Sequence, residues 1–227
     1  MRRPTRRFAV CNASAGGASS ALHGYVHRGS QRFTRLQDPR SRVGSTRRGP
    51  KAWTLGLRVP GWCAGASARL DGKGVGVLDA AGYLRIERTW KRGDVVELDL
   101  PMPPRLTEAH PRIESTRGCV AIERGPLVYC LEQADHPRGH GADLEIEVAA
   151  PLESMWAPDR LEGVALVRRA GWEVDTKPWA NQLYRPVGAP PSARRRAALT
   201  AVPYYAWANR EPGAMRVWIP RGTPGPA

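Results

Sequence analysis

From residue 51 onward, apolar and polar residues alternate along the chain in short stretches. In "WTLGLRVPGW" (53–62) an apolar side chain occupies every second position from Trp53 to Val59, which is the period of a half-buried β-strand. The stretches "YLRIERTW" (83–90) and "VVELDLPM" (95–102) alternate in the same way. Turn signals such as Asp71-Gly72 separate the stretches at spacings of about 8–12 residues, which is typical of an all-β sandwich.

A second set of predicted strands begins with "GCVAIERGPLVYCLEQADH" (118–136). Two apolar runs flank Gly125-Pro126, a dipeptide that favours a turn, so the pattern predicts a β-hairpin. Further apolar segments lie at 143–150, 163–174, 198–209 and 214–220, and a Pro-rich stretch at 175–197 predicts a long loop. No long segment has the periodicity of an amphipathic helix. The sequence therefore predicts an all-β chain with two antiparallel β-sandwich units.

Residues 1–50 show no sustained periodicity of two or about 3.6 residues. They contain 11 Arg against a single acidic residue, Asp38. We therefore expect these N-terminal 50 residues to be an irregular, basic segment. Four interpretations of it remain: an export signal with a twin-arginine element at Arg6-Arg7, an organellar transit peptide, a simple basic linker, or a mis-start or frameshift that places non-native sequence here.

The formal net charge of +14 suggests a nucleic-acid partner only until its distribution is considered. Residues 1–50 contribute +10 (11 Arg minus one Asp), so residues 51–227 contribute the remaining +4. In that body, basic and acidic residues alternate, as in "RIERTWKRGDVVELD", which is typical of solvated strand faces. We expect no nucleic-acid partner. No run of 18 apolar residues occurs, so no transmembrane helix and no membrane partner are predicted.

The cysteines are candidates for chemistry. Four of them in 227 residues are too few for a disulfide scaffold, and no pair has CxxC spacing, which favours a reducing compartment and a cytoplasmic protein. Cys119 and Cys130 lie on the two strands of the predicted hairpin. However, a zinc site needs three or four ligands, and an apolar setting disfavours a reactive thiolate. The pattern favours two packing residues. The nearby histidines, which lie in predicted loops, are His110, His136 and His140.

Carboxylates are the second candidate, because glycoside cleavage generally needs two carboxyl groups facing a sugar-sized cleft. The chain offers Glu123, Glu132, Glu145 and Glu147. Each occupies an alternating or turn position, where a solvent-facing charge is expected. No GxGxxG, P-loop, GxSxG or HExxH motif occurs. We therefore predict no catalytic, cofactor-binding or metal-binding residue in this chain.

The aromatic residues are the most suggestive feature. They could form a sugar-stacking platform, or they could fill cores and interfaces, and the second interpretation is favoured because aromatic residues bury large areas and prefer strands. The residues concerned are Trp53, Trp62, Trp90, Trp156, Trp172, Trp179, Trp207, Trp218, Tyr204 and Tyr205.

Three stretches together resemble one family. "LGLRVPGWCAGASARLDG", "RGCVAIERGPLVYCLEQADH" and "LTAVPYYAWANREPGAMRVWIP" look like the C-terminal β-sandwich region of glycoside hydrolase family 127, the β-L-arabinofuranosidase-like proteins. The similarity extends over about residues 51–220. The most specific motifs are "ERGPLVYCLE" and "PYYAWANR…MRVW", in this order.

This resemblance implies retaining glycosidase chemistry in an N-terminal (α/α)6 catalytic barrel. There the family uses a cysteine nucleophile, a glutamate acid/base, and a zinc ion held by cysteines and a glutamate. None of the matched stretches contains those motifs, so no catalytic or zinc-binding role is implied for Cys63, Cys119 or Cys130. We expect the accessory β-sandwich region of such an enzyme, without the barrel and inactive alone. Two alternatives are a stand-alone carbohydrate-binding module and a module that docks onto a catalytic partner.

The resemblance also implies a domain organisation. Residues 51–115 together with 212–222 would form the first sandwich. Residues 116–211 would form the second sandwich, inserted before the last strand of the first.

Overall fold

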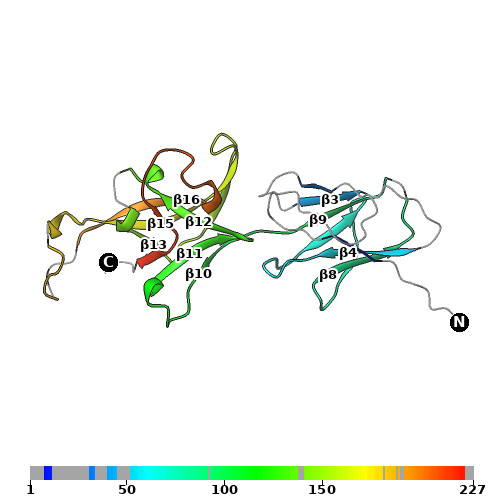
Figure 1. The fold of residues 1–227 in the computed structure, drawn as a ribbon, viewed down its shortest axis with the longest axis horizontal. Coiled ribbons are helices and arrows are strands. Elements are labelled where there is room, and N and C mark those ends of the chain that lie inside the picture. Colours follow the sequence, from blue (N-terminus) through cyan, green and yellow to red (C-terminus); the bar gives the residue numbers. More distant parts are fainter. Residues whose placement is uncertain are drawn as a thin grey trace. The chain divides into compact units, whose positions relative to one another are not determined.

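In the computed structural model, the described residues are 8–11, 31–33, 40–44, 52–91, 93–137, 141–180, 182–187, 189 and 192–222. The chain divides into unit 1, residues 1–102, and unit 2, residues 103–227 (Figure 1). All regular elements longer than a single 3-10 turn are strands, which confirms the predicted all-β class. Within the described residues, no helix has the length and apolar character that crossing a membrane requires.

Unit 1 contains two β-sheets. The four-stranded sheet has the order β1 (Phe8–Cys11), β4 (Trp53–Arg58), β8 (Tyr83–Arg88) and β7 (Val77–Leu78). The five-stranded sheet has the order β2 (Gln31–Phe33), β3 (Arg40–Gly44), β9 (Val95–Asp99), β5 (Ser67–Leu70) and β6 (Lys73–Gly74).

The two sheets of unit 1 share one apolar core. The alternation noted in the sequence directs one row of side chains inward from each strand, for instance Leu55 opposite Ile86 across β4 and β8. Trp90, 2% exposed, follows β8 and donates its indole N–H to the carbonyl oxygen of Trp53 at 3.0 Å. The buried cluster includes Leu55, Leu57, Ala68, Leu70, Leu84, Ile86, Val96 and Leu98. Unit 1 is therefore a sandwich, as predicted.

The prediction that residues 1–50 are irregular is wrong for three short segments. Strand β3 pairs with β9 over five residues, β2 pairs with β3, and β1 runs parallel to β4. The register places Arg40 opposite Asp99 and Arg42 opposite Glu97. The stretch "RSRVG" lacks the apolar alternation by which strands are recognised in a sequence, so β3 was not predicted.

Unit 2 is built around a closed ring of strands, most of which are labelled in Figure 1. Hydrogen-bonded pairs lead from β11 to β12, β16, β15, β13, β18 and back to β11. Their bounds are β11 (Cys119–Arg124), β12 (Leu127–Glu132), β13 (Leu144–Glu147), β15 (Val164–Val174), β16 (Arg194–Pro203) and β18 (Ile219–Gly222). Three further strands flank the ring: β10 (Pro104–Thr107), β14 (Glu153–Ala157) and β17 (Met215–Arg216).

The structure differs here from the predicted domain organisation. Residues 212–222 do not return to the first unit: β17 pairs with β12, and β18 pairs with both β11 and β13. The boundary between the units lies at residues 102 and 103, not at 115. The physical reason is that β18 completes the ring by pairing with both β11 and β13, and closing a barrel removes open strand edges.

The barrel wall separates two apolar clusters, because side chains alternate across each strand. The inner cluster contains Tyr129 and Leu131 of β12, Val167 of β15 and Leu199 of β16. The outer cluster contains Cys130, Val164, Leu166 and Val202 of the same strands and Ala206 of the segment after β16. Met215 and Val217 pack against it. The outer cluster is where the wall of the barrel meets the segment between β16 and β18.

Candidate functional site

The motif "GCVAIERGPLVYCLEQADH" forms the predicted hairpin. Strands β11 and β12 pair at Glu123 with Val128 and at Arg124 with Leu127. Gly125 has a φ of 58°, in the left-handed region that glycine adopts without a steric cost, and Pro126 follows it in the turn. The hairpin is therefore part of the barrel wall.

Two thiols, those of Cys63 and Cys130, lack the properties of nucleophiles. Cys130 is fully buried in the outer cluster, and burial together with the nearby charge of Glu132 raises the pKa of its thiol to about 12. Burial, followed by the charge of Asp99, also raises the pKa of Cys63. A raised pKa keeps a thiol protonated at neutral pH, whereas nucleophilic attack needs the thiolate.

The four glutamates singled out in the sequence are all engaged in ion pairs. Glu123 pairs with Arg105 at 2.6 Å, and Thr107 donates a hydrogen bond to the same carboxylate at 2.8 Å. Arg194 pairs with Glu145 and Arg196 with Glu147. The expectation of a solvent-facing charge is wrong for Glu132, which is only 5% exposed. No two of these carboxylates share a sugar-sized groove among the linings described below.

Zinc, which the family resemblance implies, does not fit the residues that the structure describes. Among them, no three His, Cys, Asp or Glu side chains are grouped so that they could hold a metal ion. Cys63 lies in the core of unit 1, whereas Cys119 and Cys130 belong to unit 2. The described residues therefore offer no ligand set for a zinc-dependent step.

Glu132 belongs to a charged cluster that sequence reasoning missed. The Arg210 guanidinium binds the carboxylate of Glu132 and also reaches both oxygens of Asp135, at 2.7 and 3.0 Å. Arg160 pairs with Asp135 at 2.7 Å. The backbone N–H of Ala208 donates to Oε1 of Glu132 at 3.0 Å. Together these bonds fasten the segment after β16 to the end of β12.

The protonation states in this cluster follow from its geometry. Burial alone would raise the pKa of Asp135, whose side chain is 3% exposed, but the hydrogen bonds and charges of Arg210 and Arg160 outweigh burial and lower it. The hydrogen bond to Asp135 in turn raises the pKa of Arg210. Both shifts favour the ionised forms of Asp135 and Arg210 at neutral pH. The chemistry of the cluster is structural.

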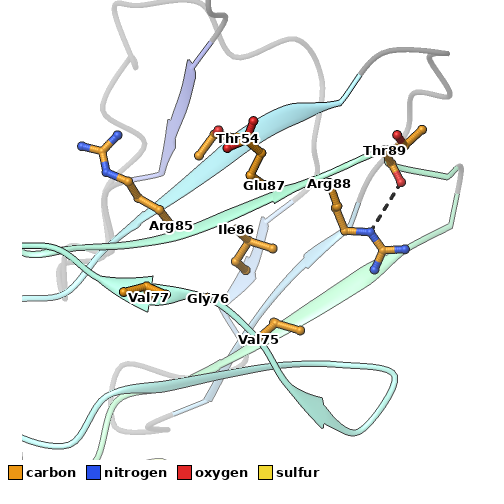
Figure 2. Close-up of a pocket in the computed structure, with 9 residues that line it drawn as sticks. All are labelled: Thr54, Val75, Gly76, Val77, Arg85, Ile86, Glu87, Arg88 and Thr89. Carbon is orange, nitrogen blue, oxygen red and sulfur yellow. Dashed lines mark hydrogen bonds between the residues drawn. The ribbon is translucent and has the colours of Figure 1, made fainter.

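A groove of about 870 Å³ lies in unit 1, beside β8 (Figure 2). Thr54 and Glu87, which pair across β4 and β8, point to the same side of the sheet. Arg88 donates to the carbonyl oxygen of Thr89 at 3.5 Å, and Arg85 pairs with Asp79. The lining of this groove consists of Thr54, Val75, Gly76, Val77, Arg85, Ile86, Glu87, Arg88 and Thr89. With a single carboxylate in its lining, this groove lacks the carboxyl pair that glycoside cleavage generally needs.

A second groove, of about 600 Å³, lies on unit 2. We call it the Tyr204 groove; it is lined by Val128, Tyr204, Met215, Arg216, Val217 and Trp218. Trp207 adjoins it, since its ring stacks on that of Tyr204 with centroids 6.0 Å apart and planes 22° apart. Both rings are substantially exposed, at 46% for Tyr204 and 38% for Trp207.

Three other tryptophans, Trp53, Trp90 and Trp172, are packed within their units. Trp53 and Trp90 form a ring pair in unit 1, with centroids 5.1 Å apart. Trp172 is buried beneath the guanidinium groups of Arg194 and Arg196. The structural interpretation of the aromatic residues therefore holds for these positions, and the exposed rings are the exception.

Two family models match this chain, and together they extend across both units. The model of the β-L-arabinofuranosidase GH127 middle domain matches residues 29–102, and that of the glycoside hydrolase family 127 C-terminal domain matches residues 104–220. Residues 29–50 thus belong to the middle-domain match, which contradicts their interpretation as sequence foreign to the fold.

Curated and solved relatives agree with these matches. The non-reducing end β-L-arabinofuranosidase of Bifidobacterium longum subsp. longum is 36% identical over 179 residues, which are 72% of this chain and 25% of the relative. A GH127 β-L-arabinofuranosidase from Geobacillus stearothermophilus superimposes with a TM-score of 0.74 at 38% identity, over 86% of this chain and 30% of that one. A further GH127 β-arabinofuranosidase gives 0.70 at 30% identity, over 85% and 31%.

This chain spans about a quarter to a third of the length of these relatives. Its two units correspond in order and boundary to the two matched domains. The chain belongs to glycoside hydrolase family 127 and comprises the middle and C-terminal domains of that family.

Proposed function

We propose that this chain serves as the accessory β-region of a β-L-arabinofuranosidase-like glycoside hydrolase and does not itself cleave glycosides. The observation that supports this most directly is the state of its candidate groups. The four glutamates singled out in the sequence are in ion pairs with arginines, and the thiol of Cys130 is buried with a raised pKa. General acid catalysis and thiolate attack need groups that are free to change protonation.

The role we propose is support of a catalytic domain in cis. The matched relatives are three to four times as long as the region they share with this chain, which covers 25–31% of them. The family resemblance implies that the catalytic machinery lies in a helical barrel outside the matched region. The two β-units would stabilise that barrel and fix its position.

The experiment is an activity assay of the purified chain with an aryl β-L-arabinofuranoside and with arabinose-containing oligosaccharides. We expect no hydrolysis above the rate without enzyme, while circular dichroism shows a folded β-protein. Turnover that is abolished by both a metal chelator and thiol alkylation would overturn the proposal. A catalytically active family 127 relative, assayed in parallel, provides the positive control.

We also propose a cytoplasmic location. The sparse cysteine usage supports it, as does the presence of Cys63, Cys119 and Cys130 as free thiols, because disulfides are the rule in oxidising compartments. Fractionation of cells expressing the tagged chain tests this, and recovery from an extracytoplasmic fraction would contradict it.

A further inference from the structure

The Tyr204 groove brings large aromatic and apolar side chains together on one surface of unit 2. Tyr204 and Trp207 lie on one short segment after β16 and present a stacked ring pair to solvent. Val128 of the hairpin, 38% exposed, adds to the same surface. Exposed aromatic and aliphatic groups that gather in one place mark interaction sites more often than scattered ones do.

The groove lies directly over the outer apolar cluster of the barrel. Met215 and Val217 contribute both to the lining of the groove and to the packing against that cluster. Ala206, between the two aromatic residues, is buried in the cluster itself. The floor of the groove is therefore continuous with a packed apolar layer, so a group that enters it would extend an existing core.

The segment that bears the rings is held in place by buried charges. Arg210 joins it to Glu132 and Asp135, whose side chains are 5% and 3% exposed. Removing charges from water costs free energy, and a well-packed apolar alternative is often as stable. A net gain in stability therefore does not by itself explain this cluster. We look for its role in the position that it gives the Tyr204–Trp207 segment.

The backbone of the same segment is also strained. Ala208 has a φ of 61°, in the left-handed region that is unfavourable for a residue with a Cβ. Its N–H is the group that donates to Glu132. The strained residue and the buried ion pairs together keep Tyr204 and Trp207 in one fixed arrangement, and a rigid surface loses less conformational entropy when it binds.

We infer that the Tyr204 groove is the surface on which the remaining, catalytic part of a family 127 chain packs. The composition supports a protein partner, since aromatic residues, Met and Arg are enriched in protein interfaces, and all three occur here. Within the lining, Arg216 already donates to the carbonyl oxygen of Ala142 at 3.0 Å, which leaves fewer of its donors for a sugar. The same fold occurs within chains that are about three times longer. The additional part of such a chain is the partner that we expect in the groove.

This inference rests on the proposed function, and one binding experiment separates the two. The catalytic part of the Geobacillus stearothermophilus relative, produced without the region that matches this chain, is titrated with the full chain by calorimetry. We expect association, weakened at least about tenfold by Tyr204→Ser together with Trp207→Ser. The matched control is Tyr184→Ser, because Tyr184 is 90% exposed and lies outside the groove.

The outcomes are distinct. Equal association of wild type, double variant and control would overturn the groove as the interface and leave the proposed function standing. No association of any variant would count against both. Quenching of tryptophan fluorescence by arabino-oligosaccharides, lost in Trp207→Ser, would overturn the inference in favour of a carbohydrate site.

A chimera covers the case in which the catalytic part does not fold alone. Residues 29–222 of this chain replace the matching region of the Geobacillus relative, and the thermal midpoint and arabinofuranosidase rate are measured. We expect the substitutions Tyr204→Ser and Trp207→Ser to lower the midpoint and the Tyr184→Ser control to leave it unchanged. An active chimera that is insensitive to the double substitution would overturn the inference.

Discussion

The two units bury different kinds of side chain. In the described part of unit 1 the buried residues are apolar, whereas unit 2 also buries Glu132, His136 and Arg169. Each of these three joins segments that lie apart in the sequence: Arg169, for example, donates to the backbone carbonyl oxygens of Glu147 and Val148. Among the described residues, the sandwich therefore buries apolar side chains, while the barrel also buries polar side chains that join separate segments.

The largest effect is expected in the apolar core of unit 1, from Trp90→Ala. Trp90 is 2% exposed, packs against Trp53 and donates a hydrogen bond to it. Removing a buried Trp side chain lowers the free energy of unfolding by about 3–5 kcal/mol. Urea denaturation measures it, with Val77→Ala as the control, because Val77 is 76% exposed and surface changes generally stay within about 0.5 kcal/mol. Losses of equal size in both variants would contradict the role of Trp90.

The next largest loss of stability is expected when the buried ion pairs of unit 2 are broken by Arg210→Met. The substitution leaves the buried carboxylate of Glu132 without its arginine, while Asp135 retains Arg160. Breaking a buried ion pair from one side costs about 3 kcal/mol or more. The control is Arg195→Met, whose pair with Glu173 is more exposed and is worth about 0–1 kcal/mol. If chemical denaturation finds the two variants equally stable, the cluster does not fasten the segment.

This comparison also explains what could be predicted from the sequence. The hairpin at 118–136 and the strands of unit 1 were predictable, because each has local apolar alternation and its own turn signals. The closure of the barrel was not, since β18 pairs with β11 about a hundred residues earlier in the chain and nothing local specifies such a partner. The short strand β3 was not predicted, because its sequence "RSRVG" lacks apolar alternation.

The candidate site was less predictable than the fold. Glu132 and Arg210 are 78 residues apart, and the alternating pattern around Glu132 indicates a solvent-facing carboxylate. The signal that could have raised the question is the pair of acids at Glu132 and Asp135 directly after an apolar strand, because two charges close to a core require a partner. Tyr204 and Trp207 were among the aromatic residues singled out in the sequence, but the sequence pattern does not show that they are exposed while the tryptophans of the cores are buried.

A smaller effect is expected from His136, which joins two strands through its ring. Its Nε2 accepts a hydrogen bond from the N–H of Thr200 at 3.2 Å, so the proton is on Nδ1, which donates to the carbonyl oxygen of Glu132 at 2.8 Å. In His136→Leu both backbone groups lose their partner, and we expect a loss of about 1–3 kcal/mol. Hydrogen exchange should accelerate at Thr200 in particular. His110→Leu, at an exposed position, provides the control, and unchanged protection of Thr200 would argue against the bridge.

The smallest expected effect is a change of stability with pH in acidic solution, which we attribute to Asp135. Its pKa in the folded protein is lowered by Arg210 and Arg160, whereas an Asp in an unfolded chain titrates near about 3.9. A group with a lowered pKa stabilises the fold fully above the unfolded value, and the contribution disappears as the pH falls through the folded value. The difference in unfolding free energy between wild type and Asp135→Asn should therefore be constant above about pH 5 and shrink below about pH 4. A difference of the same size at pH 3 as at pH 7 would show that Asp135 does not titrate in this range, and that its ion pairs with Arg210 and Arg160 are not the source of any acid sensitivity of the barrel.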